Sequence, residues 1–520
     1  MRRDAHRKEA TALAGLALCA VLLLGAALSG CRDAASREVV TTTTGVTAAE
    51  PDTTTTTTTK AAGKKKESKK QPQQSASGQQ PRQGSGQEQS FTAFPNALAF
   101  PGTIILGRPT ETAVTFSLVA DADSEAYVEY GYAPGGYGEE SARWTLRAGT
   151  PLEADLTGLR ADSAVFYRLH YKTSGAAEYS STPELSFHTA RAAGSAFTFA
   201  VEADPHIELD AKMQPALFVA ALQDMATMRP DFLIDLGDTF LGEKLAAPSL
   251  ERLEALYAHD RRYFGIVAAS APLYLVNGNH DAEWGWPAST VAGLESWTVE
   301  ARTLFYPNPF PGDFYTGDSE QTANAGYRED YYAWEWGDAL FVALDLYSHC
   351  TVDPKSSGDL WDYTLGTDQY LWLEKTLRTS TAAHKFVFAH HILGDVRGGV
   401  EWAGLYEWGG YGKSGAYEFA QERPGWDTPI HRLFVETGVD IFFQGHDHFF
   451  VKQETDGVIY QEVPQPATPT GDPQNQAHEY AYKSGEVLGS PGYLLVTVDA
   501  STVRVDFRQE GRTVYTYSIR

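Results

Sequence analysis

Five short segments of the chain combine histidine with aspartate or asparagine, which are the side chains that bind transition metals in proteins. Mixed carboxylate oxygens, amide oxygens and imidazole nitrogens suit zinc, manganese or iron, and neither calcium nor a metal that prefers thiolates. The set therefore predicts a transition-metal site. In chain order the segments are Asp204-Pro205-His206, Gly237-Asp238, Gly278-Asn279-His280-Asp281, Ala389-His390-His391 and Gly445-His446-Asp447-His448.

Nearly every one of these segments follows a short apolar run that is typical of a buried strand. An α/β sheet places its active site at such strand ends, so the segments are expected to meet there. The glycines before Asp238, Asn279 and His446 allow the backbone to turn sharply and to approach bound ions. Each segment alone is a weak signal, because short motifs of this kind arise by chance. Five segments in one order, each at a strand end, are a much stronger signal.

The ordered set resembles the signature of the calcineurin-like metallophosphoesterase superfamily, and the resemblance extends over residues 195–520. Such a resemblance implies a site with two metal ions. It also implies that His280 acts on the substrate, that Asp281 orients His280, and that His391 supports the site without binding metal. The implied ligands are Asp204, His206 and His448 for one metal, Asn279, His390 and His446 for the other, and Asp238 as the bridge between them.

Two divalent cations that share a carboxylate lie about 3.5 to 4 Å apart, produce hydroxide near neutral pH and hold both oxygens of an in-line displacement. The chain has 42 Lys and Arg against 67 Asp and Glu, a net charge of -25. Such an acidic protein repels phosphate unless bound cations reverse the field locally, and it is no scaffold for nucleic acid. We therefore expect a hydrolase of phosphate esters, mono- or diesters, with a metal-bridging hydroxide as nucleophile and His280 as proton donor or charge stabiliser.

The chain departs from one branch of the superfamily at two positions. Purple acid phosphatases have glycine where this chain has His206, and they have tyrosine three residues after the bridging aspartate, where this chain has Leu241. The imidazole of His206 is expected to replace the missing tyrosinate. The two cofactor ions are therefore expected to be divalent or mixed-valence Fe, Mn or Zn, and a ferric charge-transfer colour is not expected.

The elements that must hold these residues follow an α/β pattern from residue 197 onward. Apolar runs predict strands at 197–201, 232–236, 273–276, 341–346, 386–388 and 441–443, with helices near 211–227, 250–268, 367–378 and 428–437. Runs at 458–463, 493–498, 503–507 and 514–519 predict antiparallel strands that complete the domain. The fold class is expected to be α/β, an α+β-type four-layer metallophosphoesterase sandwich over residues 195–520.

Residues 96–190 alternate apolar and polar side chains with a period of two, which predicts an all-β sandwich. Their sequence resembles the fibronectin-III-like domain that precedes the catalytic domain of purple acid phosphatases. The segments that carry this resemblance are Glu129-Tyr130-Gly131, Leu156-Thr157-Gly158-Leu159, Tyr167-Arg168-Leu169 and Ser186-Phe187-His188-Thr189. We expect this sandwich to be a spacer that binds no ligand of its own.

The N-terminal region has the pattern of a membrane-targeting segment. Basic residues precede an apolar run from Leu13 to Leu28, as in a secretory signal, although a membrane span has a similar length. The sequence Leu28-Ser29-Gly30-Cys31 resembles the bacterial lipobox, so residues 1–30 are expected to be a lipoprotein signal peptide and Cys31 to be lipidated. Residues 31–95 are rich in Thr, Lys and Gln and are expected to be a disordered linker. The protein is then extracytoplasmic and is attached to the cell membrane by lipid.

Four further side chains are candidates for substrate contact. Trp284 follows Asp281 closely, and Arg397, Trp402 and Trp408 belong to a Gly-rich and aromatic-rich interval at 394–426. This interval could form a platform or lid over the site, and ordinary packing of a long loop is an equal alternative. A phosphodiesterase of nucleotides or phospholipid headgroups is a second enzyme hypothesis. An inactive surface adhesion or scaffold protein is the hypothesis from another class, and the sequence leaves substrate, metal identity and oligomeric state open.

Overall fold

The computed structural model of the protein describes residues 98–286, 291–394 and 396–520. The expected signal peptide, Cys31 and the linker at 31–95 lie outside the described residues. The chain separates into two units, Met1–Ser85 and Gly86–Arg520, and the elements below belong to the second unit. Within the described ranges, no helix is both long enough and apolar enough to cross a membrane.

The first sheet of the α/β domain at residues 195–520 has six strands, of which the first three along the chain are parallel. The last three strands are antiparallel and extend this sheet on one side. In spatial order the strands are β12 (Leu273–Leu275), β11 (Phe232–Asp235), β10 (Phe197–Glu202), β23 (Tyr493–Asp499), β24 (Thr502–Gln509) and β25 (Arg512–Ile519).

The second sheet has eight strands and a parallel centre that runs from β17 to β21. The strand that starts at Val458 therefore differs from the all-antiparallel expectation, because it pairs parallel with β19 and antiparallel with β20. In spatial order the strands are β13 (Thr316–Gly317), β16 (Tyr332–Trp336), β17 (Ala339–Ala343), β18 (His384–Phe388), β19 (Ile441–Gln444), β21 (Val458–Glu462), β20 (Phe450–Thr455) and β22 (Glu486–Leu488).

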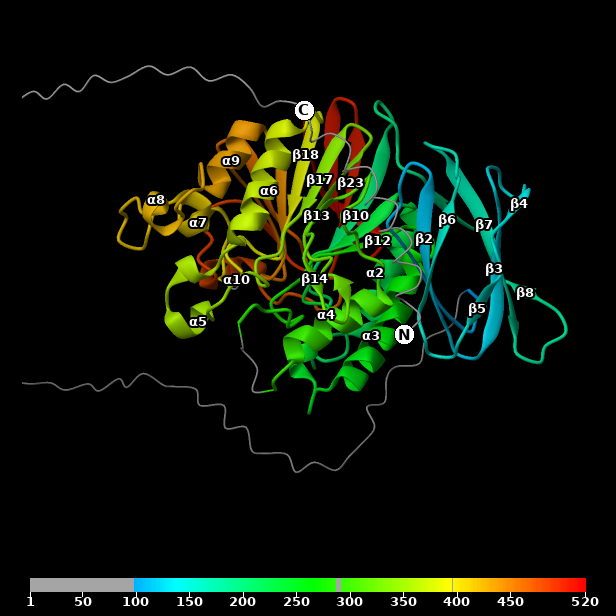
Figure 1. The fold of residues 1–520 in the computed structure, drawn as a ribbon. Coiled ribbons are helices and arrows are strands. Elements are labelled where there is room, and N and C mark those ends of the chain that lie inside the picture. The colour runs from blue at the N-terminus through cyan, green and yellow to red at the C-terminus, as the bar shows by residue number, and fades with distance from the viewer. Residues whose placement is uncertain (1–97, 287–290, 395) are drawn as a thin grey trace, which may run out of the picture. The chain divides into compact units, whose positions relative to one another are not determined.

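An aromatic core lies between the two sheets and contains Phe199, Phe341, Phe388 and Phe443, all fully buried. Helices cover the outer face of each sheet, so the domain has four layers, as expected from the sequence (Figure 1). The principal helices are α2 (Pro215–Met228), α3 (Leu250–Ala268) and α4 (Leu294–Phe305) on the first sheet, and α6 (Gly366–Thr379) and α9 (Ile430–Thr437) on the second.

The helix expected at 250–268 forms over those same residues, and its start is capped by the Ser249 side chain, which accepts a hydrogen bond from Arg252 N. The strand expected at 341–346 instead spans Ala339–Ala343. Sequence periodicity did not predict α4, β16 or β20. The remaining short elements are η1 (Gly242–Lys244), β14 (Gln321–Thr322), β15 (Gly326–Tyr327), α5 (Pro354–Ser357), η2 (Leu360–Asp362), η3 (Val400–Trp402), α7 (Tyr406–Gly409), α8 (Phe419–Glu422) and α10 (Pro473–Glu479).

Residues 102–188 form two antiparallel sheets around a separate apolar core, which is consistent with the expected β-sandwich. One sheet contains β1 (Gly102–Gly107), β2 (Ala113–Ala120) and β6 (Leu152–Thr157); the other contains β4 (Glu139–Glu140), β3 (Ser124–Gly131), β7 (Ala164–Thr173) and β8 (Ser180–Ser181), with β5 (Trp144–Leu146) on β3 and β9 (Leu185–His188) on β7.

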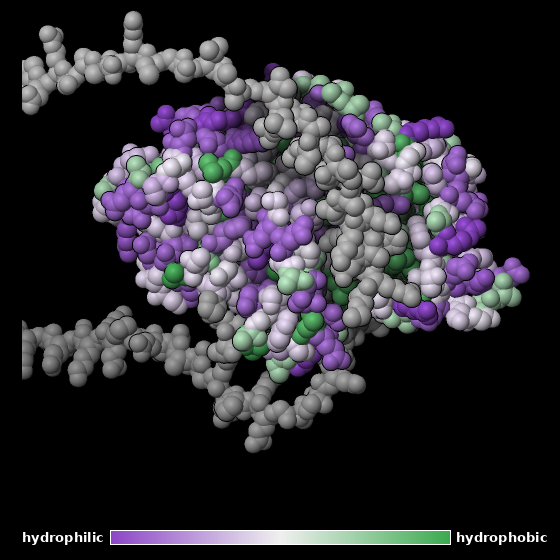
Figure 2. Space-filling model, in the orientation of Figure 1, coloured by the Kyte–Doolittle hydropathy of each residue, from purple (hydrophilic) through white to green (hydrophobic). Residues whose placement is uncertain are grey.

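The face of the protein in Figure 2 is mostly hydrophilic, with scattered apolar residues, as expected for this acidic composition.

Candidate metal centre

The five predicted segments follow the carboxyl ends of strands in both sheets. Asp204 comes two residues after β10, Asp238 three after β11, and Asn279 four after β12. His390 and His446 follow β18 and β19 in the second sheet. Because parallel strands end at the same edge of a sheet, the two stacked sheets bring all five segments to one place. The structure therefore brings together the metal ligands that the sequence predicted.

The first group of possible ligands contains Asp204, His206 and His448. His448 Nε2 lies 3.3 Å from Asp204 Oδ1, and His206 Nε2 lies 3.7 Å from the same oxygen. All three side chains are largely shielded from solvent, and Asp204 is fully buried. Three donor atoms at these separations can surround one cation.

The second group contains Asp238, His390 and His446, with Asn279 beside them. His390 Nε2 is 3.2 Å from Asn279 Oδ1, 3.2 Å from His446 Nδ1 and 3.3 Å from Asp238 Oδ2. Four donor atoms from four separate segments therefore converge. An amide, a carboxylate and two imidazoles are a donor set suited to a transition metal.

Asp238 lies between the two groups. Its Oδ2 is 3.3 Å from His390 Nε2 in the second group and 3.7 Å from His206 Nε2 in the first. Its Oδ1 accepts a hydrogen bond of 2.7 Å from His280 N, which fixes the carboxylate. One oxygen that faces both groups is the arrangement that a bridging ligand requires.

The remaining atoms of these side chains are held so that their ligand atoms face inward. His390 Nδ1 donates to Leu236 O at 2.9 Å, and Asp204 Oδ2 accepts from His446 N at 2.7 Å. Such outer contacts set the tautomer and orientation of a ligand. Among the described residues, Asp204 Oδ1 and His206 Nε2 are buried and have no hydrogen-bond partner. A buried polar atom without a partner is costly, so these atoms fit a bound cation.

Charge at the centre favours cation binding. Burial by itself would raise the pKa of Asp204 and Asp238, but the neighbouring histidines hold both pKa values well below their usual range. Both carboxyls are therefore ionised at neutral pH. Two buried carboxylates are costly without compensating positive charge, and metal ions supply that charge.

The ligand segments adopt strained and crowded backbone. Asp204, His206 and Asp238 have φ between +51° and +55°, a left-handed conformation that is uncommon outside glycine and typical of functional sites. A Cβ on Gly278 would lie 2.1 Å from Asp238 N, so only glycine allows the two ligand loops to touch. Gly237, the first of the three glycines noted in the sequence, has a φ of +92°, a conformation that glycine adopts without strain.

His280 lies beside the centre, but Asp281 does not orient it. His280 Nε2 is 3.9 Å from Asp238 Oδ2, and His280 Nδ1 hydrogen-bonds to Glu243 Oε1 in η1. The Asp281 carboxylate is buried and accepts backbone hydrogen bonds of 2.8 to 3.0 Å from Gly278, Asp238, Thr239 and Phe240. Asp281 therefore joins two ligand loops, and the orienting role expected for it falls to Glu243. Adjacency in sequence misled here, because neighbouring side chains on a turn point in different directions.

His391 is fully buried next to the second group. Burial and the nearby positive charge of His390 lower the pKa of His391 to about 3, so this imidazole is neutral. Its Nε2 lies 2.8 Å from Gly398 O, and its Nδ1 accepts from Leu393 N at 3.4 Å. The ring therefore holds the 391–398 loop and has no lone pair left for a metal.

Arg397 is held at the rim of the centre. Its Nη1 donates to His446 O and, at 3.2 Å, to Asp447 Oδ1, while its guanidinium lies 4.8 Å from the centroid of the Tyr480 ring. Asp447 also accepts hydrogen bonds from Gly398 N at 2.8 Å and from Tyr482 OH at 2.7 Å. Asp447 thus ties the loop that carries Arg397 to the loop that carries two ligands. Sequence reasoning assigned no such role to Asp447.

The three predicted tryptophans have different positions. Trp284 is buried, and its Nε1 donates to Asn279 O at 2.8 Å, so it supports a ligand loop. Trp402 is partly buried, and its Nε1 donates to Arg397 O at 2.7 Å. Trp408 is fully buried and packs on Phe434 and Phe442. The expectation that Trp408 contacts substrate was wrong, because its aromatic surface is used in the core.

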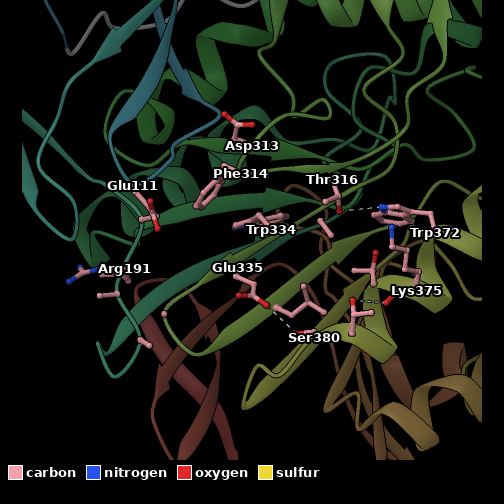
Figure 3. A pocket seen from close by; sticks show the side chains of 18 residues that line it. Glu111, Arg191, Asp313, Phe314, Thr316, Trp334, Glu335, Trp372, Lys375 and Ser380 are labelled. Atoms are coloured by element: carbon pink, nitrogen blue, oxygen red, sulfur yellow. Dashed lines mark hydrogen bonds between the residues drawn. The ribbon is translucent and has the colours of Figure 1, made fainter. Parts of the chain in front are cut away.

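A cavity of about 730 Å³ lies away from this centre. It is lined in part by Gly337 and Leu340 at the start of β17, whereas His390 follows the end of the parallel strand β18. Three of its polar side chains have partners: Arg191 donates to Asp231, Ser380 to Glu335, and Trp372 to Thr316, the last two drawn as dashed lines in Figure 3. This cavity is therefore separate from the metal centre.

Two curated relatives come from Arabidopsis thaliana. The chain is 27% identical over 188 residues to probable inactive purple acid phosphatase 24, and 26% identical over 188 residues to probable inactive purple acid phosphatase 27. Each match covers 35% of this chain and 24% of the relative, so only about a quarter of each relative's length is matched.

Solved structures share the fold at low sequence identity. The chain is similar to the purple acid phosphatase PPD1 from yellow lupin seeds, with a TM-score of 0.52, 15% identity, and coverage of 81% of this chain and 75% of that chain. It is similar to PhoD with a TM-score of 0.56, 13% identity, and coverage of 82% and 90%. A sequence profile of the calcineurin-like phosphoesterase family matches residues 197–450, the segment that contains all the ligands described above. Residues 197–450 therefore belong to the calcineurin-like phosphoesterase family.

Proposed function

We propose that the protein hydrolyses phosphate esters, mono- or diesters, at a centre that holds two transition-metal ions. The observation that carries this proposal is the position of Asp238, whose Oδ2 faces His206 in one ligand group and His390 in the other. The ligands of this centre are the two groups described above, with Asn279 in the second group. When bound, two such ions activate water and neutralise the charge of a phosphate that this acidic protein would otherwise repel.

The chain's own side chains supply orientation and proton transfer. His280 is partly exposed and directs Nε2 towards the centre, so it can protonate the leaving oxygen of an ester or donate a hydrogen bond to a phosphate oxygen. Arg397 has a partly exposed guanidinium at the rim, and donors other than Nη1 can meet an anionic oxygen there. Trp402 would act through Arg397, because it binds the Arg397 carbonyl.

The place of action follows from the N-terminal pattern. We infer from Leu28-Ser29-Gly30-Cys31 that Cys31 is lipidated and that the enzyme works on the outer face of the cell membrane, at the end of the linker at 31–95. Mass spectrometry of the mature N-terminus from the native host should find an acylated Cys31. A soluble product that begins elsewhere, or an uncleaved N-terminal segment, would contradict the lipid anchor without touching the hydrolase proposal.

A second candidate is a phosphatase-like protein without activity. The names of the two Arabidopsis relatives include the word inactive, which supports this candidate. The complete set of ligand types and the two buried ligand atoms without partners support an active centre instead. A centre that had lost its metals would be expected to have lost at least one ligand.

Metal content and hydrolysis test the proposal together. The wild-type protein should bind about two transition-metal ions per chain and hydrolyse at least one ester in a screen of monoester, diester and phospholipid substrates with added Zn, Mn or Fe. Asp238→Ala should lose most of both ions, because one oxygen serves both groups, whereas Asn279→Ala should mainly weaken one. The exposed Asp313→Ala is the control and should keep both.

Two results would contradict the proposal. A folded wild-type protein that binds no metal in metal-replete buffer would show that the proposed metal centre does not exist. Two bound metals without hydrolysis of any substrate class in the screen would favour the inactive candidate.

A further inference from the structure

Arg261 of helix α3 is fully buried where the α/β domain contacts the β-sandwich. Its guanidinium donates to Thr103 Oγ1 at 2.9 Å, to Ser117 Oγ at 3.0 Å and to Ser117 O at 2.8 Å, and it also bonds Phe305 O. Thr103 and Ser117 belong to β1 and β2 of the sandwich. All of these acceptors are neutral, and burial lowers the pKa of Arg261 to about 10. A buried cation that is satisfied only by fixed neutral acceptors depends strongly on their geometry.

Apolar side chains also pack between α3 and the sandwich, beside the hydrogen bonds of Arg261. Ile105 of β1 and Val119 of β2 are buried in the same core as Phe264 and Val267 of α3. Tyr167 of β7 also donates its hydroxyl to Ala269 O at the end of α3, at 2.5 Å. Strands β1 and β2 are therefore buried on both faces, one towards the sandwich core and one towards α3. This does not match a spacer that only separates two parts.

Helix α3 also contacts two of the ligand loops. Tyr263 donates its hydroxyl to Glu208 Oε1 at 2.7 Å, and Glu208 is two residues after the candidate ligand His206. Tyr257 stacks on Phe240 with ring centroids 4.0 Å apart, and Phe240 is two residues after Asp238. Helix α3 thus contacts both the sandwich and the loops that carry Asp204, His206 and Asp238.

We propose that Arg261 is a positioning residue for the metal centre, and that the β-sandwich acts through α3 as part of the scaffold that holds the ligand loops. The identity of the ligands rests on the proposed function. The physical reason is the backbone strain: the left-handed conformations in the two loops persist only where surrounding structure holds them. Tyr263 and Tyr257 support these two loops. Their helix is held in turn by the hydrogen bonds that the Arg261 guanidinium donates to the sandwich.

The test compares neighbouring arginines on the same helix. Arg261→Lys keeps the charge but cannot reproduce the planar fork of donors. Ser117→Ala removes one acceptor from the sandwich side and changes nothing in α3. Arg262→Lys is the matched control: Arg262 also reaches the sandwich, through Asp121 at 2.9 Å, but this ion pair is exposed, with 39% and 46% of the two side chains accessible. Exposed pairs of this kind contribute little.

Two measurements are made on each folded variant, one of which needs no metal. In metal-free protein, hydrogen exchange of the amides at 204–213 should be at least about threefold faster in Arg261→Lys and Ser117→Ala than in wild type. In chelator competition, one of the two metals should bind about tenfold more weakly, a loss typical of altered support around ligands. That metal is the one in the group of Asp204, His206 and His448, because two of its ligands lie in the loop next to Glu208, whereas the other group shares only the bridging Asp238 with the loops that α3 contacts. Arg262→Lys should match wild type in both.

Wild-type exchange and wild-type metal affinity in folded Arg261→Lys would overturn the inference, and so would an equal effect of Arg262→Lys. If Arg261→Lys does not fold, Ser117→Ala decides in the same way. The two proposals fail differently: wild-type protein without metal or hydrolysis contradicts the proposed function, whereas an active two-metal enzyme with unchanged variants contradicts only the role of Arg261.

Discussion

Glu243 hydrogen-bonds to Nδ1 of His280, and this contact leaves His280 Nε2 directed at the metal centre, 3.9 Å from Asp238 Oδ2. The two residues come from different loops, since Glu243 lies in η1 and His280 follows β12. A carboxylate on one ring nitrogen fixes the tautomer and orientation of the other, which is what a proton donor to a leaving group needs.

Glu243→Gln should therefore lower kcat/KM by roughly tenfold or more, with a larger loss for alkyl esters than for nitrophenyl esters. The difference arises because a poor leaving group depends most on protonation. Lys244→Gln, at the next and exposed position of η1, is the control and should leave both rates near wild type. Equal losses with both ester classes would assign His280 to phosphate binding instead.

Two tryptophans of the 394–426 interval should respond in opposite ways. Trp408 is fully buried, so Trp408→Ala should lower the free energy of unfolding by about 3 to 5 kcal/mol and leave kcat/KM of the folded fraction unchanged. Trp402→Phe keeps an aromatic ring but loses the bond to Arg397 O. It should lower kcat/KM with a change in stability of at most about 1 kcal/mol. Urea unfolding and steady-state kinetics check both predictions. An unchanged kcat/KM in Trp402→Phe would show that Trp402 does not help to position the substrate.

A buried carboxyl pair predicts how stability depends on pH. Burial, and then the negative charge of Asp330, raise the pKa of Asp318 to about 8, whereas an unfolded chain ionises this group near 3.9. Between these values the folded state binds the extra proton, so the contribution of Asp318 to stability is present at low pH and falls as pH rises to about 8. Asp318→Asn keeps a donor towards Asp330 without the ionisation.

The variant should therefore gain stability relative to wild type between pH 5 and pH 8.5, by at least about 1 kcal/mol, since one unit of pKa corresponds to about 1.4 kcal/mol. Asp313→Asn, at an exposed position nearby, should show no such trend. Urea denaturation at both pH values measures the difference, and parallel stability curves for Asp318→Asn and wild type would contradict the prediction.

Leu241 stands three residues after Asp238, where the resemblance to purple acid phosphatases implies a tyrosine, and its aliphatic side chain is fully buried. Tyr347 lies near the centre, with its ring centroid 6.2 Å from that of His390, but its hydroxyl donates to Gly394 O at 2.7 Å. Protein reconstituted with iron should therefore show no tyrosinate charge-transfer band in its visible spectrum. A purple protein would mean that a tyrosine does ligate iron.

Much of the fold and most of the candidate ligands could be predicted because both depend on local order along the chain. Apolar runs located the parallel strands, and a ligand type after each strand end, as in Asp204 and His390, is positioned by the sheet alone. The periodicity of α4 and β16 did not reveal them. Their burial is decided by neighbours from distant parts of the chain, such as the contact of Trp334 in β16 with Tyr274 in β12.

The sequence by itself determined which candidate ligand types stand at the strand ends, and its resemblance to a known superfamily implied the four-layer fold and the bridging place of Asp238. Only the tertiary structure decided which carboxylate meets His280, that Asp281 joins two loops, that Trp408 belongs to the core and that Arg261 joins the sandwich to α3. The physical reason is that a side chain's partner depends on the direction in which each loop leaves its element. Loops from separate elements meet only after the sheets have stacked, and spacing along the chain does not encode that direction.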